Sequence, residues 1–111
     1  MKGCSLRFYM HENQRHHGKL LYEWLLEQAR QRRINGGSAF RAIAGFGRHG
    51  VLSDQGFFEL AGQLTVLVEF IVSESEADEL LDIVREDGAP LFYARFPAEF
   101  GVVTGASAGQ A

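Results

Sequence analysis

Four histidines are the side chains of this chain best suited to bind a metal ion. They stand at positions 11, 16, 17 and 49. His16 and His17 are adjacent, and neither a regular strand nor a helix would point both rings comfortably at one ion. No spacing of cysteine and histidine matches a known metal cage either. We therefore expect a polar loop here and predict no metal site, with metal binding by the histidines as the alternative.

Cationic side chains beside these histidines favour an anion site. Arg15, His16, His17 and Lys19 come just before a predicted helix, whose first backbone N–H groups have no partner within the helix. Arginine makes up nine of the eleven cationic residues, and its planar guanidinium suits forked recognition of phosphate or carboxylate. The pattern is typical of a site for a small anionic ligand.

A glycine-punctuated segment, Gly-Phe-Gly-Arg-His-Gly at residues 45–50, is the second candidate site. Gly45 and Gly47 would let a ligand approach the backbone closely. Arg48 would add a charge suited to phosphate, and His49 could form a hydrogen bond. The segment joins two predicted strands and leads into no helix, so it is not a dinucleotide-binding fingerprint. A plain glycine loop is the alternative interpretation.

No arrangement of residues indicates a catalytic centre. Cys4 has no activating partner readable from the sequence, and the carboxylates have no positioned partner acid or base. The formal net charge of −3 argues against nucleic-acid binding. One cysteine cannot form an intrachain disulfide, and no apolar stretch approaches the roughly 20 residues of a membrane span. We expect a cytoplasmic, non-enzymatic protein without a cofactor.

The elements that would position these residues follow from hydrophobic periodicity. Alternation predicts strands, and spacing of three to four residues predicts helices. A Ser73–Glu76 capping box marks the start of the second helix, and Gly88 marks its end. The expected elements are a strand over 5–11, a helix over 19–33, strands over 39–46 and 63–73, a helix over 74–87 and a strand over 90–96 ended by Pro97.

This order, β-α-β-β-α-β, predicts an α+β, ferredoxin-like fold with two helices on one face of a four-stranded antiparallel sheet. Residues 1–103 would form one domain and residues 104–111 a disordered tail. The strand over 63–73 is apolar on both faces, yet the helices cover only one face of the sheet. So short a chain has nothing else with which to cover the other face. We therefore expect a homo-oligomer packed sheet against sheet.

The sequence resembles a known family. The residues that carry the resemblance are Leu-Arg-Phe-Tyr at 6–9, Arg-His-His-Gly-Lys at 15–19, Leu-Tyr-Glu at 21–23, Ala-Arg at 29–30 and the run from Phe40 to His49. They are similar to the PII-like proteins catalogued as domain of unknown function one-ninety. The resemblance implies a homotrimer that binds a nucleotide or another small effector between subunits, at the base of a flexible T-loop.

The same resemblance assigns roles to particular residues. Gly45, Gly47 and Arg48 would line the cleft, with the run from Arg15 to Lys19 as a second cationic wall. Gly88 lies in the turn that corresponds to the B-loop, which keeps one glycine here where nucleotide-binding PII proteins have several and a lysine. Arg95 occupies the strand on which PII proteins hold phosphate-binding arginines.

These observations predict a trimeric signalling module that binds a small anionic effector, with an adenine nucleotide as the candidate. The effector would order the loop over 48–62 and so change the binding of a partner such as a membrane transporter or an enzyme. Phe57 and Phe58 would be the partner-binding anchors if they are exposed. The alternative is a metal-binding trimer of the CutA-like kind, which shares this fold and would use the loop histidines.

Overall fold

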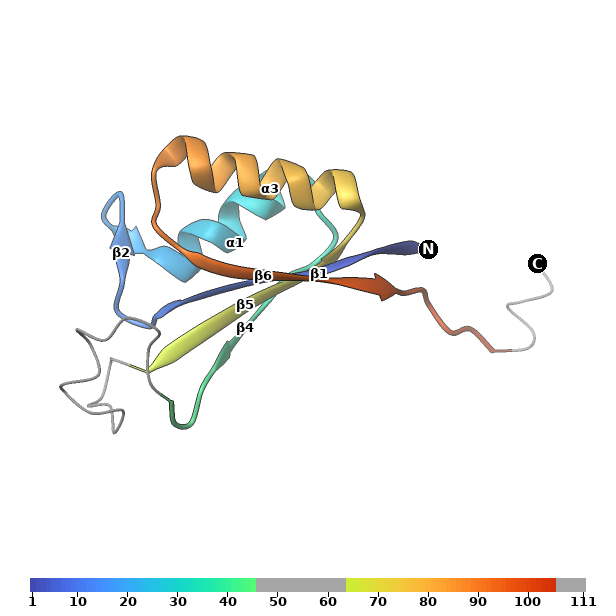
Figure 1. Cartoon of the computed structure of the whole chain (residues 1–111), viewed down its shortest axis with the longest axis horizontal. Helices are drawn as coiled ribbons and strands as arrows, with labels where there is room; N and C mark the ends of the chain where they lie inside the picture. The colour runs from blue at the N-terminus through green and yellow to red at the C-terminus, as the bar shows by residue number, and fades with distance from the viewer. Residues whose placement is uncertain (46–63, 106–111) are drawn as a thin grey trace.

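The computed structural model describes residues 1–45 and 64–105 (Figure 1). The elements along the chain are β1 (Lys2–His11), β2 (Arg15–His16), β3 (Lys19–Leu20), α1 (Leu21–Gln31), β4 (Ser38–Arg41), β5 (Thr65–Val72), α3 (Glu74–Asp87) and β6 (Phe92–Glu99).

Four of the strands form one antiparallel sheet in the order β4-β5-β1-β6. In Figure 1, α1 and α3 both lie over the same face of this sheet. β2 and β3 pair only with each other, as a small hairpin between β1 and α1. The main sheet with its two described helices is the predicted ferredoxin-like fold, which is confirmed.

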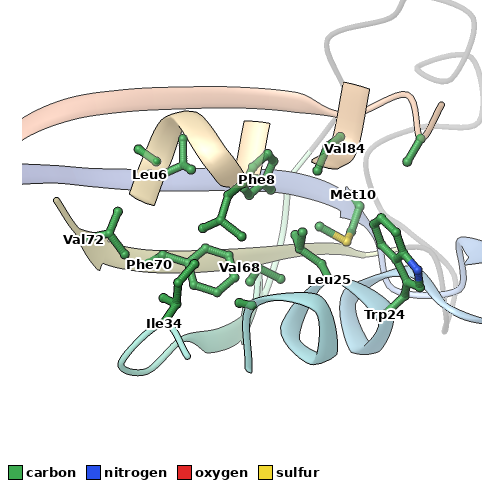
Figure 2. Packing of buried hydrophobic residues seen from close by; sticks show 14 of the residues in the cluster. Leu6, Phe8, Met10, Trp24, Leu25, Ile34, Val68, Phe70, Val72 and Val84 are labelled. Atoms are coloured by element: carbon green, nitrogen blue, oxygen red, sulfur yellow. The ribbon is translucent and has the colours of Figure 1, made fainter. Parts of the chain in front are cut away.

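The core lies between the sheet and the helices. Strand alternation sends Leu6 and Phe8 of β1 and Phe70 of β5 to the helix side, where all three are fully buried (Figure 2). Phe8 and Phe70 meet edge to face with ring centroids 6.3 Å apart. Leu25 of α1 and Leu80 of α3 complete the contact from the helix side. This layer fixes both helices on the sheet.

The opposite face of the sheet, which we call the outer face, carries aromatic and aliphatic side chains. The register places Phe40, Ile71, Phe92 and Phe96 there, and each remains 39–52% exposed. At the centre, Arg7 donates to Glu69 at 3.1 Å and lies 5.1 Å from the ring centre of Phe96. Among the described residues, the prediction that this face carries apolar side chains which the helices do not cover is therefore confirmed.

α3 begins and ends where the sequence predicts. The Ser73 side chain accepts a bond from the backbone N–H of Glu76 at 3.2 Å, and the Glu76 side chain accepts one from the N–H of Ser73 at 2.9 Å. Gly88 follows the helix in the left-handed conformation with φ of 76°. This conformation suits glycine because it has no Cβ.

Several predicted boundaries were wrong. The first strand begins at Lys2 instead of residue 5. The first helix begins at Leu21 instead of residue 19, because Lys19 and Leu20 pair as β3. The second strand is limited to Ser38–Arg41 among the described residues. Pro97 does not end the last strand, which continues to Glu99 with Pro97 opposite Cys4. β6 is an edge strand, where a proline removes no bond that the sheet needs.

Candidate functional site

The hairpin of β2 and β3 replaces the polar loop expected at residues 15–19. Arg15 pairs with Leu20 and His16 with Lys19. The two turn residues, His17 and Gly18, both have positive φ values of 54° and 76°. This is the combination that a two-residue hairpin turn of type I′ requires, and glycine adopts it without strain. The turn sets the directions of the two histidine side chains.

Both histidines point to one carboxylate at the end of α3. The Nε2 atom of His17 lies 2.7 Å from Oδ2 of Asp87. Nε2 of His16 makes a short contact with the same oxygen. The two imidazole rings are 4.2 Å apart, and the His16 ring meets Trp24 of α1 edge on at 4.5 Å. The hairpin, α1 and α3 thus converge on a His16–His17–Asp87 cluster.

This geometry corrects the argument that adjacent histidines cannot point at one ion. The argument assumed a regular strand or helix, in which neighbouring side chains diverge. Here His16 ends β2 and His17 occupies a left-handed turn position, so the backbone rotates between them. One ring nitrogen of each histidine and a carboxylate oxygen of Asp87 all lie within 4.8 Å of one another.

The electrostatics of the cluster centre on Asp87. The hydrogen bond from His16 lowers the pKa of the Asp87 carboxyl, with a further lowering contribution from His17 and an opposing one from desolvation. Side-chain exposure is 15% for His16, 61% for His17 and 36% for Asp87. One ring is therefore held against the protein, while the carboxylate and the second ring remain reachable from solvent.

The hairpin also carries the cations predicted for an anion site. Arg15 and Lys19 are both exposed. Arg15 donates a long bond of 3.4 Å from Nη1 to the carbonyl oxygen of Gly18. These two side chains thus flank the turn that presents the histidines, and Gly88 lies next to Asp87 in the chain.

Arg95 lies apart from this cluster. Its guanidinium donates to Asp78 at 2.9 Å and makes a short contact with Glu74, and these bonds raise its pKa. Glu74 and Asp87 occupy opposite ends of the 14-residue α3, which corresponds to about 20 Å along the helix axis. Within one chain, Arg95 and the hairpin do not form a single cleft.

A hollow of about 430 Å³ lies at this far end of α3, lined by Lys2, Gly3, Glu74, Pro97, Ala98 and Glu99. Two carboxylates and one ammonium group face it, so its charge disfavours an anionic ligand. The structure therefore gives no support to an anion site beside Arg95 within one chain.

The other predicted site residues are placed only in part. Gly45 is described and lies outside any strand, and a Cβ there would meet no atom within 4 Å. Gly47, Arg48, His49, Phe57 and Phe58 lie outside the described residues. Their predicted roles remain predictions.

Asp87 is the residue of this cluster that the sequence pattern does not single out, because the pattern indicates only the end of a helix and the turn that resembles the B-loop. One signal was available. An acidic residue in the last turn of a helix meets the negative end of the helix dipole, which is unfavourable unless a cation or hydrogen-bond donor compensates it. Asp87 is the last residue of α3, and the two histidines supply the donors.

Comparison with a solved structure identifies the fold. The structure superimposes on the crystal structure of a candidate PII-like signalling protein from Thermus thermophilus with a TM-score of 0.61. The two share 17% sequence identity, and the match covers 87% of each chain. The fold is that of the PII-like proteins.

Comparison of sequences identifies the family. Residues 3–88 match the model of DUF190, described as Uncharacterized ACR, COG1993. The chain is 35% identical over 85 residues to a UPF0166 protein of Aquifex aeolicus, covering 77% of this chain and 81% of that protein. It is 24% identical over 92 residues to a UPF0166 protein of Methanocaldococcus jannaschii, covering 79% and 84% respectively. The chain belongs to the DUF190 family.

Within the described part of the chain, no helix combines the length and the apolar composition needed to cross a membrane.

Proposed function

We propose that this chain is a PII-like regulatory protein that acts as a homotrimer. It binds a small anionic effector between subunits, with an adenine nucleotide as the first candidate. It passes the signal through residues 48–62 to a partner such as a membrane transporter or an enzyme. The observation that carries the proposal is the exposed apolar outer face on a PII-like sheet.

The outer face supports self-association because nothing in the described chain covers it. Its main apolar side chains, Phe40, Ile71, Phe92 and Phe96, are only about half removed from water. Complete burial of a large apolar side chain contributes about 1.5–3 kcal/mol. Burial of these side chains against two further copies of the chain would therefore contribute several kcal/mol to the free energy of assembly. The helices lie on the other face and would stay outside this contact.

The anion-binding part of the proposal is supported by the hairpin. Lys19 and Arg15 are exposed, and within the described residues neither would have to leave an ion pair with a carboxylate to meet a phosphate. Arg95 would have to leave Glu74 and Asp78 first, so we assign it a secondary role. By the family resemblance, Arg48 and the glycines at 45 and 47 would complete the cleft, with His16, His17 and His49 as hydrogen-bonding groups.

The effector would act by a shift of population. A ligand that contacts the ordered form of residues 48–62 better than other forms favours the ordered form by that difference in binding free energy. Phe57 and Phe58 are the anchors that the ordered segment would present to the partner. No covalent chemistry is required, and the proposal assigns no catalytic residue.

The test is isothermal calorimetry of the intact chain with ATP, ADP, AMP and cyclic dinucleotides. Lys19→Ala is expected to weaken binding of the preferred nucleotide about three- to tenfold, because one charged hydrogen bond to phosphate is lost. Lys2→Ala removes the same charge at the far end of β1 and should leave the Kd unchanged. Arg48→Ala should weaken binding as well.

Two results would contradict the proposal. One is the absence of heat or saturable binding with every nucleotide tested. The other is a Lys19→Ala variant that binds as tightly as Lys2→Ala, which would remove the hairpin from the site.

A further inference from the structure

We propose that His16, His17 and Asp87 form a binding site for a divalent transition-metal ion. Three donor atoms from two segments remote in sequence define the site. They are Nε2 of His16, Nε2 of His17 and Oδ2 of Asp87. This site gives His16 and His17 a role as metal ligands, in place of the hydrogen-bonding role that they have in the proposed effector cleft. Because all three donors belong to one chain, the proposal holds for a single chain as well as for a trimer.

The donor atoms lie close to the arrangement that an ion requires. Ligand bonds to zinc are about 2.0–2.2 Å for nitrogen and oxygen, so tetrahedral donors stand about 3.3–3.5 Å apart. Nε2 of His17 lies 2.7 Å from Oδ2 of Asp87, and all three donors lie within 4.8 Å of one another. Movements of roughly half to one ångström in these side chains would admit the ion. The ion would replace the protons that now lie between nitrogen and oxygen.

The two histidine rings differ in how firmly the surrounding protein holds them. His16 is held by its edge-on contact with Trp24 and is 15% exposed, so its ring is positioned in advance. His17 is 61% exposed and can swing to close on an ion. One fixed imidazole, one movable imidazole and a carboxylate at a helix end give a site that an ion can enter from solvent.

Asp87 and the end of α3 favour a cation, although the exposed Arg15 and Lys19 of the hairpin flank the same turn. Asp87 ends α3, where the helix dipole already places partial negative charge, and Glu86 precedes it. Within the described residues, the two imidazoles form the hydrogen bonds to Asp87. A neutral imidazole carries no formal charge, so it does not cancel the charge of the carboxylate. A divalent ion would compensate the carboxylate and the helix end together.

The donor set selects the class of metal. Two imidazoles and a carboxylate suit zinc, cobalt, nickel, copper or ferrous iron, whereas magnesium and calcium prefer oxygen ligands alone. Three protein ligands leave at least one coordination position for water or another small ligand.

The test uses the tag-free chain of 111 residues, stripped with a chelator and dialysed against Zn²⁺ or Co²⁺ at neutral pH. We expect about one ion per chain, a visible absorption band with Co²⁺, and no competition from Mg²⁺. His17→Asn keeps a residue that tolerates the left-handed turn, and Asp87→Asn removes the carboxylate charge. Each should raise the Kd for zinc at least about tenfold, while the matched control Glu86→Gln should not.

Binding should also weaken at acidic pH, because protons compete with the ion for the ring nitrogens and the carboxylate. Absence of saturable binding of Zn²⁺ and Co²⁺ would overturn the proposal. So would binding that His17→Asn and Asp87→Asn affect no more than Glu86→Gln does. His17 is largely exposed, so the fold should survive its replacement. A change in zinc affinity of this variant can therefore be distinguished from a loss of folding.

Discussion

Asp87 combines a structural and a chemical role in one side chain. As the last residue of α3 it would be unfavourable beside the helix dipole, yet it accepts hydrogen bonds from two imidazoles. Those bonds tie the hairpin to the end of the second helix, across about 70 residues of sequence. The same oxygen is the donor atom that the metal proposal requires.

The lowered pKa of Asp87 predicts how its contribution to stability depends on pH. A carboxyl group whose pKa is lower in the folded than in the unfolded state stabilises the fold when ionised, and this contribution is lost as the pH falls through the folded-state pKa. In the presence of a chelator, Asp87→Asn should therefore lower the Tm near neutral pH. The difference from the wild type should shrink as the pH falls from about 5 towards 2.

Thermal unfolding followed by circular dichroism over this pH range is the measurement. Glu86→Gln, one residue earlier, is the control for loss of a negative charge at the helix end. A difference between Asp87→Asn and the wild type that stays constant at all these pH values would contradict the assigned role of the ionised carboxyl.

At the scale of elements, α3 shows how local sequence alone can fix a helix. Ser73 and Glu76 satisfy each other's backbone N–H groups at its start, and Gly88 adopts the left-handed conformation at its end. Both signals lie within the helix sequence and its flanking residues. The cap also sets the position of Asp87, because the helix runs without interruption from one end to the other.

Removal of the cap should weaken the whole domain, since α3 covers the sheet. Ser73→Ala is expected to lower the free energy of unfolding by about 1 kcal/mol. Ser75→Ala is the matched control, because it removes a hydroxyl that contacts Ser73 Oγ at 3.2 Å but takes part in neither of the two backbone bonds of the capping box. Urea denaturation of both variants distinguishes them, and equal stabilities would show that the capping box contributes nothing measurable.

At the scale of the whole molecule, the sheet has one covered and one exposed face. Both helices lie over one side of the sheet, where the core is (Figure 1). The outer face displays half-exposed phenylalanines around the Arg7–Glu69 pair. Charged and apolar groups alternate on this face. Such a mixture can pack against a second copy and also set the register of packing.

The trimer proposal predicts that a charge on the outer face will dissociate the assembly. Ile71→Glu places a second carboxylate on the same face of β5 as Glu69, and burying it without a partner would cost several kcal/mol. Light scattering should give three times the 12.4 kDa of one chain for the wild type, and a lower mass for the variant. Val103→Glu, at a 99% exposed position outside the strands, is the control. A wild type that remains monomeric at micromolar concentration would contradict the proposal.

Periodicity and capping signals were sufficient to predict the order of the main-sheet strands and the two described helices, and the two-layer fold. The hairpin at 15–20 was missed because two-residue strands leave no periodic pattern. The continuation of β6 through Pro97 was missed because a proline is acceptable only when its strand lies at the edge of the sheet. That position depends on strand order and not on local sequence.

The sequence by itself determined an α+β domain with one uncovered apolar sheet face, and it singled out Arg15, His16, His17 and Lys19 as chemically distinctive. Only the tertiary structure decided what these residues meet. It placed Asp87 beside the two histidines and directed Arg95 to Glu74 and Asp78 instead. Hydrophobic periodicity is a local property that a sequence displays directly, whereas the meeting of a turn with a distant helix end depends on how the helices pack over the sheet.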